Sequence, residues 1–389
     1  MEQKNLIFIR GRDAWQDVCM EQLIDGASRR GLNTYVIDYR RLDSFQGEVF
    51  HEYISRPGCV LLTFQGNGII LNDGTENIWA KHHIPVYSMM YRFIQEDYAL
   101  LEKPGCDIRI LAADRQLADL ISGLCPGIKG VRFLPFGGTI PSVKEEKTND
   151  VLILGDCERE RSTYYEKIPY LEDDGVTLIT SCVAEMIGNP GLSAADAIRR
   201  YFDAGNEVCT EEQFSELLIT VRQDIEETVS RFFKQELIQA LDRAGIPMKA
   251  YGKNWEAPDY ILTDSTKLYP APAVDERLRL YGNAKIAVVF SPECHDGCCS
   301  DLPTALLSGS LCVTEPNPWL AEKYQDGMHL IYLDHMNPNQ AVADIQYLLA
   351  HPDRCAEIAN AGKERAKEQD TWEHRLSSIL EMMDEDMTS

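Results

Sequence analysis

Short runs of apolar residues recur along the first third of the chain, separated by longer segments of mixed polarity. Between the runs, helix-length segments at about 13–30, 92–103 and 115–124 place their apolar residues on one face. Near-continuous apolar strands that alternate with helices are typical of a parallel sheet covered on both faces. This part of the chain therefore predicts a doubly wound α/β domain. Its strands are expected at residues 5–11, 33–39, 59–68, 84–90, 106–114 and 130–138.

A charged stretch at 141–150 interrupts this pattern, and a new strand pattern begins at 149–156. Residues 182–243 are then almost purely helical, which we interpret as a helical insertion in a second doubly wound domain. The later strands are expected at 246–252, 285–292, 310–316 and 329–334, and the last helices at 338–350, 353–368 and 371–383.

These patterns predict two Rossmann-like domains that face a cleft. We expect the first domain at 1–145 and the second at 146–370, with the insertion at 182–243. Residues 371–389 are expected to form a C-terminal helix that packs back on the first domain. A chain of 389 residues exceeds one ordinary core and suits two domains.

The composition excludes several classes of partner. A formal net charge of −24 opposes nucleic-acid binding, which needs clustered Lys and Arg to neutralise phosphates. No apolar stretch approaches the roughly 20 residues of a membrane span. Twelve cysteines without a secretion signal predict reduced, mostly buried thiols and a cytoplasmic protein. The oligomeric state does not follow from these features.

In doubly wound sheets, ligands bind beyond the carboxyl ends of the strands. Four predicted strands end in loops that could form such a site: 66–68, 135–138, 252–255 and 291–297. The glycine-rich members of these cleft loops are Gly66, Asn67, Gly68, Gly137 and Gly138.

Residues 291–315, SPECHDGCCSDLPTALLSGSLCVTE, combine candidate metal ligands with a short helix. Cys294, His295, Cys298 and Cys299 have zinc-ligand side chains, but adjacent cysteines do not easily converge on one ion. The sequence therefore favours no metal. The helix near 301–309 begins with Pro303 in its first turn, and its start is either an anion site or a tightly packed turn.

Common nucleotide and nucleophile motifs are absent from the sequence. The first strand ends in RGRDAW (10–15) without the G-x-G-x-x-G of a dinucleotide site, so an NAD enzyme is disfavoured. No Walker A lysine loop and no G-x-S-x-G nucleophile elbow occurs. The absence of these motifs argues against the enzyme classes that depend on them.

Four segments occur in an order that resembles a known family: YGKNW (251–255), RLRLYGNAKIAVVFSP (277–292), DLPTALLSGSLCVTE (301–315) and the helical segment 350–376. Together they resemble the C-terminal half of group 1 glycosyltransferases, in particular the CgeB-like (spore-maturation-type) branch. That branch has the GT-B fold, in which two Rossmann-like domains face a cleft. The resemblance implies a sugar-nucleotide donor on the second domain and an acceptor on the first.

The resemblance places the donor beside loop 252–255, loop 291–297 and the helix near 301–309. It implies that Lys253 binds phosphate as a point charge, whereas Trp255 either stacks on the base or packs in the core. A UDP-sugar is the favoured donor, with no metal or other cofactor. The donor-binding residues are then Lys253, Asn254, Trp255, Ser291, Glu293, His295, Asp296, Asp301, Leu302, Thr304, Ser308 and Gly309.

One position departs from the family pattern. Where the motif R.FEalasG carries glutamate, this chain has Thr304, and the arginine is replaced by Asp301. That glutamate commonly holds the ribose hydroxyls in the wider class. Its absence implies that Glu293, Asp296 or Glu315 replaces it, that the donor is unusual, or that activity is lost.

An inverting reaction also needs a general base from the first domain. Asp73, just beyond the 66–68 loop, and His83 are the candidates. The lead hypothesis is therefore a glycosyltransferase whose acceptor is a protein, a glycan or a small molecule. The alternatives are a nucleotide-sugar epimerase or hydrolase, and a non-catalytic GT-B scaffold that binds a protein through residues 182–243.

Overall fold

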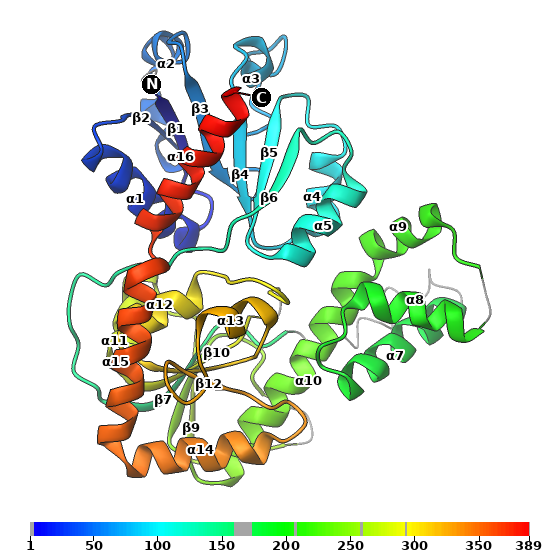
Figure 1. The fold of residues 1–389 in the computed structure, drawn as a ribbon, viewed down its shortest axis with the longest axis vertical. Coiled ribbons are helices and arrows are strands. Elements are labelled where there is room, and N and C mark those ends of the chain that lie inside the picture. The colour runs from blue at the N-terminus through cyan, green and yellow to red at the C-terminus, as the bar shows by residue number, and fades with distance from the viewer. Residues whose placement is uncertain (1–3, 159–172, 206–207, 257–259, 292–293, 389) are drawn as a thin grey trace. The chain divides into compact units, whose positions relative to one another are not determined.

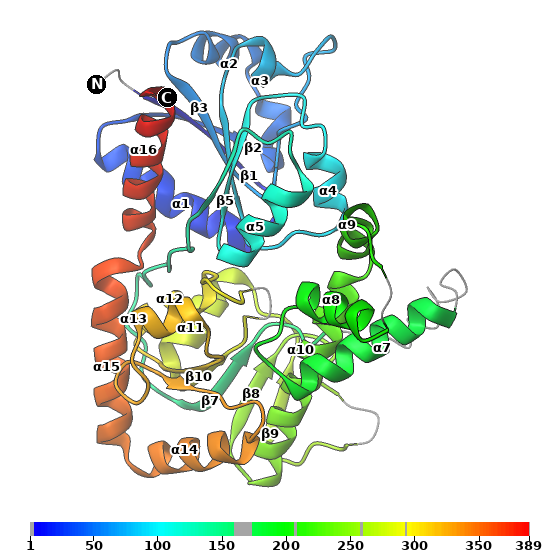
Figure 2. The ribbon, with the colours of Figure 1, turned by 45° about the vertical axis from the view of Figure 1, so that its right-hand side comes forward.

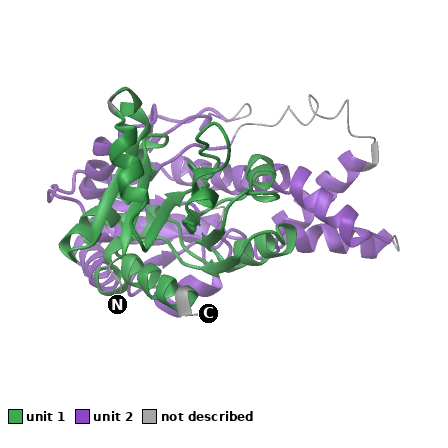
Figure 3. Cartoon of the chain, turned by 90° about the horizontal axis from the view of Figure 1, so that it is seen from above, with its two compact units in different colours: residues 1–140, 296–304, 366–389 green, residues 141–295, 305–365 purple. Residues whose placement is uncertain are grey.

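The computed structural model describes residues 4–158, 173–205, 208–256, 260–291 and 294–388 (Figure 1). The chain forms two compact units, which Figure 3 shows in different colours. Unit 1 comprises Met1–Ile140, Asp296–Thr304 and Ala366–Ser389. Unit 2 comprises Pro141–His295 and Ala305–Arg365. No helix among the described residues is both long and apolar enough to cross a bilayer.

Unit 1 contains a six-stranded parallel sheet in the order β2-β1-β3-β4-β5-β6. After β1, the chain adds β2 on one side and then β3 on the other. The topological switch point of this sheet therefore lies between β1 and β3. The strands are β1 (Asn5–Arg10), β2 (Asn33–Asp38), β3 (Cys59–Phe64), β4 (Val86–Met90), β5 (Ile108–Ala112) and β6 (Gly130–Phe133).

Alternation along β1 divides the core of unit 1 between the two faces of its sheet. Leu6 and Phe8 pack against α1 (Ala14–Arg29) and α16 (Trp372–Thr388), whereas Ile7 and Ile9 pack against the helices of the other face. Those helices are α2 (Gly47–Ile54), α3 (Ile78–Lys81), α4 (Gln95–Leu101) and α5 (Arg115–Leu124), and a 3-10 helix, η1 (Tyr39–Ser44), follows β2.

The C-terminal helix α16 is joined to the rest of unit 1 by ion pairs and by a close backbone approach. Glu373 pairs with Arg29 and Arg30 of the α1 segment. A Cβ on Gly137 would lie 2.6 Å from the backbone nitrogen of Trp372, so only glycine fits there. The glycine-rich loop at 135–138 thus serves to seat α16.

Unit 2 contains a second six-stranded parallel sheet, in the order β12-β11-β10-β7-β8-β9. The chain adds β8 and β9 on one side of β7, and then β10 on the other. Its switch point therefore lies between β7 and β10. The strands are β7 (Asn149–Leu154), β8 (Met248–Tyr251), β9 (Thr266–Tyr269), β10 (Ala284–Val289), β11 (Leu311–Thr314) and β12 (Ile331–Tyr332).

Helices cover the second sheet, and α10 (Arg222–Arg243) runs from the helices of the insertion to this sheet (Figure 2). Its residues Leu237, Ile238 and Leu241 pack on β7 and β10 together with α14 (Pro338–Ala350) and α15 (Pro352–Gln369). The N-terminal half of α10 packs with the helices of the insertion. These are α7 (Asp173–Gly188), α8 (Ala194–Gly205) and α9 (Glu211–Thr220); the remaining helices are α11 (Val274–Asn283), α12 (Asp301–Leu307) and α13 (Pro318–Lys323).

The two parallel sheets with helices on both faces confirm the predicted fold class. The sequence patterns missed β9, α2, α3, α11 and α13, none of which is longer than ten residues. β9 has one buried residue in its four and lies at the edge of its sheet, so it carries no continuous apolar run.

Asp242 near the end of α10 is a buried carboxylate that holds the segment before β9. It accepts hydrogen bonds from Tyr260 Oη at 2.9 Å, from the Thr263 amide at 2.9 Å and from Thr266 Oγ1 at 2.5 Å. Burial by itself would raise the pKa of Asp242, but these donors outweigh it and hold the pKa below the ordinary value. The ionised form therefore stabilises the fold.

Replacing Asp242 by Asn is expected to lower the free energy of unfolding at pH 7 by about 2–4 kcal/mol, because the amide presents two donors to a ring of donors. A lowered folded-state pKa contributes stability above the unfolded value and loses it as the pH falls through the folded one. Urea denaturation of both proteins from pH 7 to pH 3 should therefore show a gap that narrows below about pH 4. A constant gap would contradict this account.

Candidate functional site

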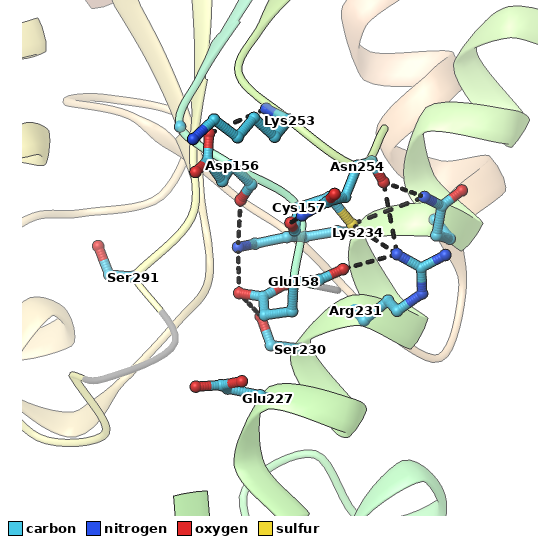
Figure 4. Close-up of polar contacts among 12 residues, drawn as sticks. Asp156, Cys157, Glu158, Glu227, Ser230, Arg231, Lys234, Lys253, Asn254 and Ser291 are labelled. Atoms are coloured by element: carbon cyan, nitrogen blue, oxygen red, sulfur yellow. Dashed lines mark hydrogen bonds and ion pairs between the residues drawn. The ribbon is translucent and has the colours of Figure 1, made fainter. Parts of the chain in front are cut away.

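The carboxyl ends of β7 and β10 mark the switch point of unit 2, where ligands of doubly wound sheets bind. The chain leaves β7 through Gly155–Glu158 and β10 through Phe290 and Ser291. The exit of β8, residues 252–255, lies beside the exit of β7. Residues of α10 complete the cluster (Figure 4).

A backbone hydrogen bond and a side-chain hydrogen bond join the exits of β7 and β8. The Cys157 amide donates to Lys253 O at 3.0 Å, and Asn254 Nδ2 donates to Cys157 O at 3.0 Å. A Cβ on Gly252, whose φ is +145°, would lie 2.1 Å from Gly155 O. The two loops form one rigid ledge because glycine at 252 permits this approach.

A buried ion pair lies directly beneath this ledge. Lys234 of α10 is 5% exposed, and its Nζ contacts Glu158 Oε1 at 2.6 Å and Asp156 O at 3.2 Å. Ser230, one turn earlier, donates to the same Glu158 oxygen at 3.0 Å (Figure 4). The second oxygen, Glu158 Oε2, is buried and has no hydrogen-bond partner among the described residues. It is available to accept a hydrogen bond from a ligand hydroxyl.

Arg231 and Gln235 fasten the same helix to both loops. Arg231 Nη1 donates to Glu158 O at 2.6 Å, and Gln235 Nε2 donates to Trp255 O at 3.2 Å. The Lys234 ammonium also lies over the ring of Phe290, 5.6 Å from its centroid. The helix thus places a positive charge at the switch point.

A second carboxylate, Glu315, follows β11 on the same edge of the sheet. Its Oε2 accepts the Ser291 amide at 2.8 Å, and its Oε1 is 3.5 Å from His335 Nε2. Burial by itself would raise the pKa of Glu315, but His335, the Ser291 amide and the charge of Lys234 hold it below the ordinary value. Glu315 is therefore ionised at neutral pH. His335 is stacked on Phe233, with ring centroids 4.2 Å apart.

The structure brings four of the expected donor residues to this site. Lys253 is exposed, and its ammonium has no partner among the residues that the structure describes. Asn254 has a φ of +62° and joins the loops, and Ser291 binds Glu315. Trp255 is 2% exposed, and its Nε1 donates to Gly155 O at 3.0 Å. Trp255 was predicted either to stack on the base or to pack in the core, and the structure shows it packed in the core.

Other expected donor residues lie elsewhere. Asp296 belongs to unit 1, where it pairs with Arg115 at 3.3 Å, and His295 is 4.0 Å from Glu226 in unit 2. Asp301 and Leu302 begin α12 in unit 1, and Leu302 is buried. Glu293 lies outside the described residues.

Thr304, which occupies the family's glutamate position, is fully buried in unit 1. Its hydroxyl donates to Ser300 O at 2.6 Å and accepts the Thr139 amide at 2.9 Å. Both hydrogen bonds are internal to the fold. The side chain of Thr304 is thus a structural link.

Ser308 and Gly309 follow the C-terminal end of α12, next to the start of β11. Ser308 O is 3.4 Å from Lys147 Nζ, and Lys147 precedes β7. They therefore lie at the amino edge of the second sheet, opposite the cluster around Lys234.

The cysteines depart from the expectation that all are reduced. Ten are free thiols, eight of them buried, but Cys294 and Cys299 are disulfide-bonded. Both lie on the cysteine-rich segment between β10 and α12, where close spacing makes pairing geometrically accessible. Among the described residues, no group of three or more His, Cys, Asp or Glu is placed to hold a metal ion.

The two candidate bases of unit 1 occupy unfavourable places. Asp73 pairs with Lys81 Nζ at 2.5 Å and caps its own turn through Thr75. These contacts hold the pKa of Asp73 well below its usual range, which makes it a weak proton acceptor. His83 follows α3 and precedes β4, so it lies at the amino edge of the first sheet. Gly66, Asn67 and Gly68 do lie at the carboxyl edge, at the switch point of unit 1.

Sequence reasoning missed Glu158, Ser230 and Lys234. A signal was present in α10, where Ser230 and Lys234 fall among the apolar residues Val229, Phe233 and Leu237 on the buried face. Buried lysines are rare unless they are paired, so this position indicated a charged partner. The partner, Glu158, lies 76 residues away in sequence.

Two doubly wound units in one chain define the GT-B class of fold, and solved structures with this architecture match nearly the whole chain. Sucrose-phosphate synthase from Thermosynechococcus elongatus is 11% identical, with a TM-score of 0.53 over 99% of both chains. The Anabaena protein HepE in complex with UDP and glucose is 10% identical, with a TM-score of 0.53 over 98% of this chain and 100% of that one. At these identities the likeness shows the fold.

A match to a protein-family model adds information on activity to this fold assignment. Residues 222–381, less than half of the chain, match the family described as glycosyl transferase-like. The match covers α10, the exit of β8, and the segment from β10 to α16. It confirms the prediction of a glycosyltransferase enzyme, and the CgeB-like subgroup stays a prediction. No curated protein sequence matches the chain.

Proposed function

We propose that this protein transfers a sugar from a nucleotide-sugar donor, and that unit 2 binds the donor at the switch point between β7 and β10. The observation that carries the proposal is the cluster of Lys234, Glu158 and Lys253 at this edge. Lys234 and Lys253 lie inside the region that matches the family model, and Glu158 precedes it. A third solved structure of the same fold, the DNA-modifying β-glucosyltransferase, was studied with uridine diphosphoglucose; it is 12% identical, with a TM-score of 0.51 over 98% of this chain and 99% of that one. Together with HepE, it supports a uridine nucleotide as donor.

The chemistry of the cluster suits a diphosphate and a ribose. Lys253 supplies a free ammonium for the phosphates, and Lys234 adds positive potential from below the ledge. The free oxygen of Glu158 and the ionised carboxylate of Glu315 are acceptors for hydroxyl groups. In the wider class, a glutamate at the position of Thr304 commonly holds the ribose hydroxyls. Glu315 is our candidate for this role in the present chain.

Positive side chains also provide what the leaving group requires. When the glycosidic bond to the nucleotide breaks, negative charge grows on the diphosphate, and a preorganised cation stabilises it. Lys253 and Lys234 would meet that need without a metal ion. The proposal therefore includes metal-independent transfer, as well as a cytoplasmic location in keeping with the ten free thiols.

The first test is donor binding by the full chain. UDP should raise the melting temperature by mass action, and Lys253→Ala should weaken UDP binding by about tenfold at an unchanged melting temperature of the free protein. Isothermal titration calorimetry with UDP measures the dissociation constants. Lys267→Ala is the matched control, because Lys267 is an exposed lysine of the same unit on edge strand β9. Equal losses in both variants, or no UDP binding at all, would contradict the proposal.

A further inference from the structure

The carboxyl edge of the sheet in unit 1 is a second place where a ligand could bind, on a different sheet from the proposed donor site. Its switch point lies between β1 and β3, so the exits of these strands are where this sheet would bind a ligand. The exit of β1 leads into α1 through residues 11–13, and the exit of β3 is the loop 65–68.

The exit of β3 stores backbone strain. Gln65 has a φ of +48°, and Gly66 and Gly68 follow at +65° and +80°. A left-handed conformation is unfavourable for glutamine and persists only where the surroundings impose it; such residues cluster at functional sites. Here Gln65 Oε1 accepts the Tyr91 amide at 2.9 Å, and its Nε2 donates to Arg92 O at 3.3 Å. The strained residue thereby fixes the exit of β4.

Two arginines flank this loop, and each lies over a tyrosine ring. The Arg12 guanidinium is 4.7 Å from the centroid of Tyr39, and that of Arg92 is 5.8 Å from the centroid of Tyr91. Both arginines are exposed. In the described part of the chain, neither has an ion pair or a side-chain hydrogen bond.

The acidic groups near Arg12 are already engaged. Asp38 pairs with Arg10 and Arg40, and Asp17 pairs with Arg40 and accepts the Gly11 amide at 2.7 Å. Asp13 caps α1 by accepting the Gln16 amide at 2.8 Å. In a chain whose net charge is −24, two exposed arginines at one sheet edge that pair with no carboxylate among the described residues are unusual.

We propose that Arg12 and Arg92 bind an oxyanion, a phosphate or a carboxylate, carried by the sugar acceptor. The guanidinium fork matches either group, and stacking on tyrosine orients it in advance. The N-terminus of the 16-residue helix α1 at the same switch point adds a favourable dipole. In the order β1-β3-β4, two strand spacings separate the strands that carry the arginines, about 10 Å, which suits a sugar-sized ligand.

The identity of this ligand as acceptor rests on the proposed transferase function, whereas the anion site itself does not. The test uses the full chain, with glucose 6-phosphate, glucuronate and glucose as probes in calorimetric titrations, with and without UDP. Both charged probes should bind at least about tenfold more tightly than glucose. Arg12→Ala and Arg92→Ala should each cost about tenfold in binding of the charged probes, with UDP binding unchanged.

Arg56→Ala is the matched control. Arg56 also lies over a tyrosine ring, that of Tyr53 at 4.9 Å, but it pairs with Glu52 and precedes β3 at the opposite edge of the sheet. The Arg56→Ala variant should therefore bind all three probes and UDP as tightly as the unmodified protein does. Tighter binding of glucose 6-phosphate assigns a phosphate, and tighter binding of glucuronate assigns a carboxylate.

The outcomes separate the two proposals. If glucose binds as tightly as the charged probes, if neither charged probe binds, or if Arg56→Ala is as damaging as the other two variants, the anion site is overturned. If charged probes bind in an Arg12- and Arg92-dependent way but UDP does not bind, the anion site stands and the transferase proposal fails.

Discussion

Replacing Lys234 by Met is expected to lower the free energy of unfolding by about 3–5 kcal/mol, because it leaves a buried carboxylate without its counterion. Lys234 and Glu158 have side chains that are only 7% and 13% exposed, and their charged atoms are 2.6 Å apart. Ser230 would then be the one remaining side-chain donor that the structure shows to the carboxylate of Glu158. Urea denaturation at neutral pH measures the loss.

The double variant Lys234→Met/Glu158→Gln separates the ion pair from simple packing. Removing both charges also removes the desolvation cost, so the double variant should regain most of the lost stability. Lys253→Met is the control, because this exposed lysine should be replaceable within about 0.5 kcal/mol. The single variants Lys234→Met and Glu158→Gln each lose some free energy of unfolding. If these two losses simply add in the double variant, the two side chains are not coupled, which would contradict the ion-pair explanation. UDP binding should be weakened in every variant that lacks Lys234.

Most strand positions were predictable because parallel strands are buried on both faces. Runs such as the one in β3, where all six residues are buried, leave a clear apolar signal in the sequence. Edge strands lack this signal, and β9 was therefore missed. The carboxyl-edge rule then located loops 66–68 and 252–255 correctly, because it depends only on strand direction.

The chemistry of the site was less predictable, since it depends on contacts between distant segments. Lys234 lies on a helix, and its partner Glu158 follows β7, so neither position identifies the pair by itself. Glycine-rich loops were also ambiguous. Gly137 resembled a ligand loop, but the structure uses its missing side chain to seat Trp372. Only the position of the backbone distinguishes a glycine needed for packing from one needed for a ligand.

Thr304 differs from the family motif and has a structural role in this chain. A glutamate at this fully buried position would disturb the bonds to Ser300 and Thr139. The ionised carboxylate of Glu315 follows β11 at the edge where the donor is proposed to bind. The sequence showed the loss at Thr304, whereas the ionisation of Glu315 depends on His335 and Ser291, which the structure brings to it.

Replacing Gly252 by Ala is expected to cost about 2–4 kcal/mol in stability and to abolish measurable UDP binding, because the new Cβ would collide with backbone. That Cβ would lie 2.1 Å from Gly155 O, and a φ of +145° is strained for alanine. Relief requires the exits of β7 and β8 to separate. Separation would break the hydrogen bond between the Cys157 amide and Lys253 O and displace Lys253.

Gly155→Ala is the matched control for this prediction. Gly155 also has a positive φ, +122°, but a Cβ there meets no atom within 4 Å. Gly155→Ala should therefore lose only the stability that corresponds to backbone strain, about 1–3 kcal/mol, and should still bind UDP. Urea denaturation and calorimetric titration with UDP measure the two effects separately. If Gly252→Ala binds UDP as well as Gly155→Ala does, the ledge formed by the two loops does not position the donor, since the clash distinguishes the two variants.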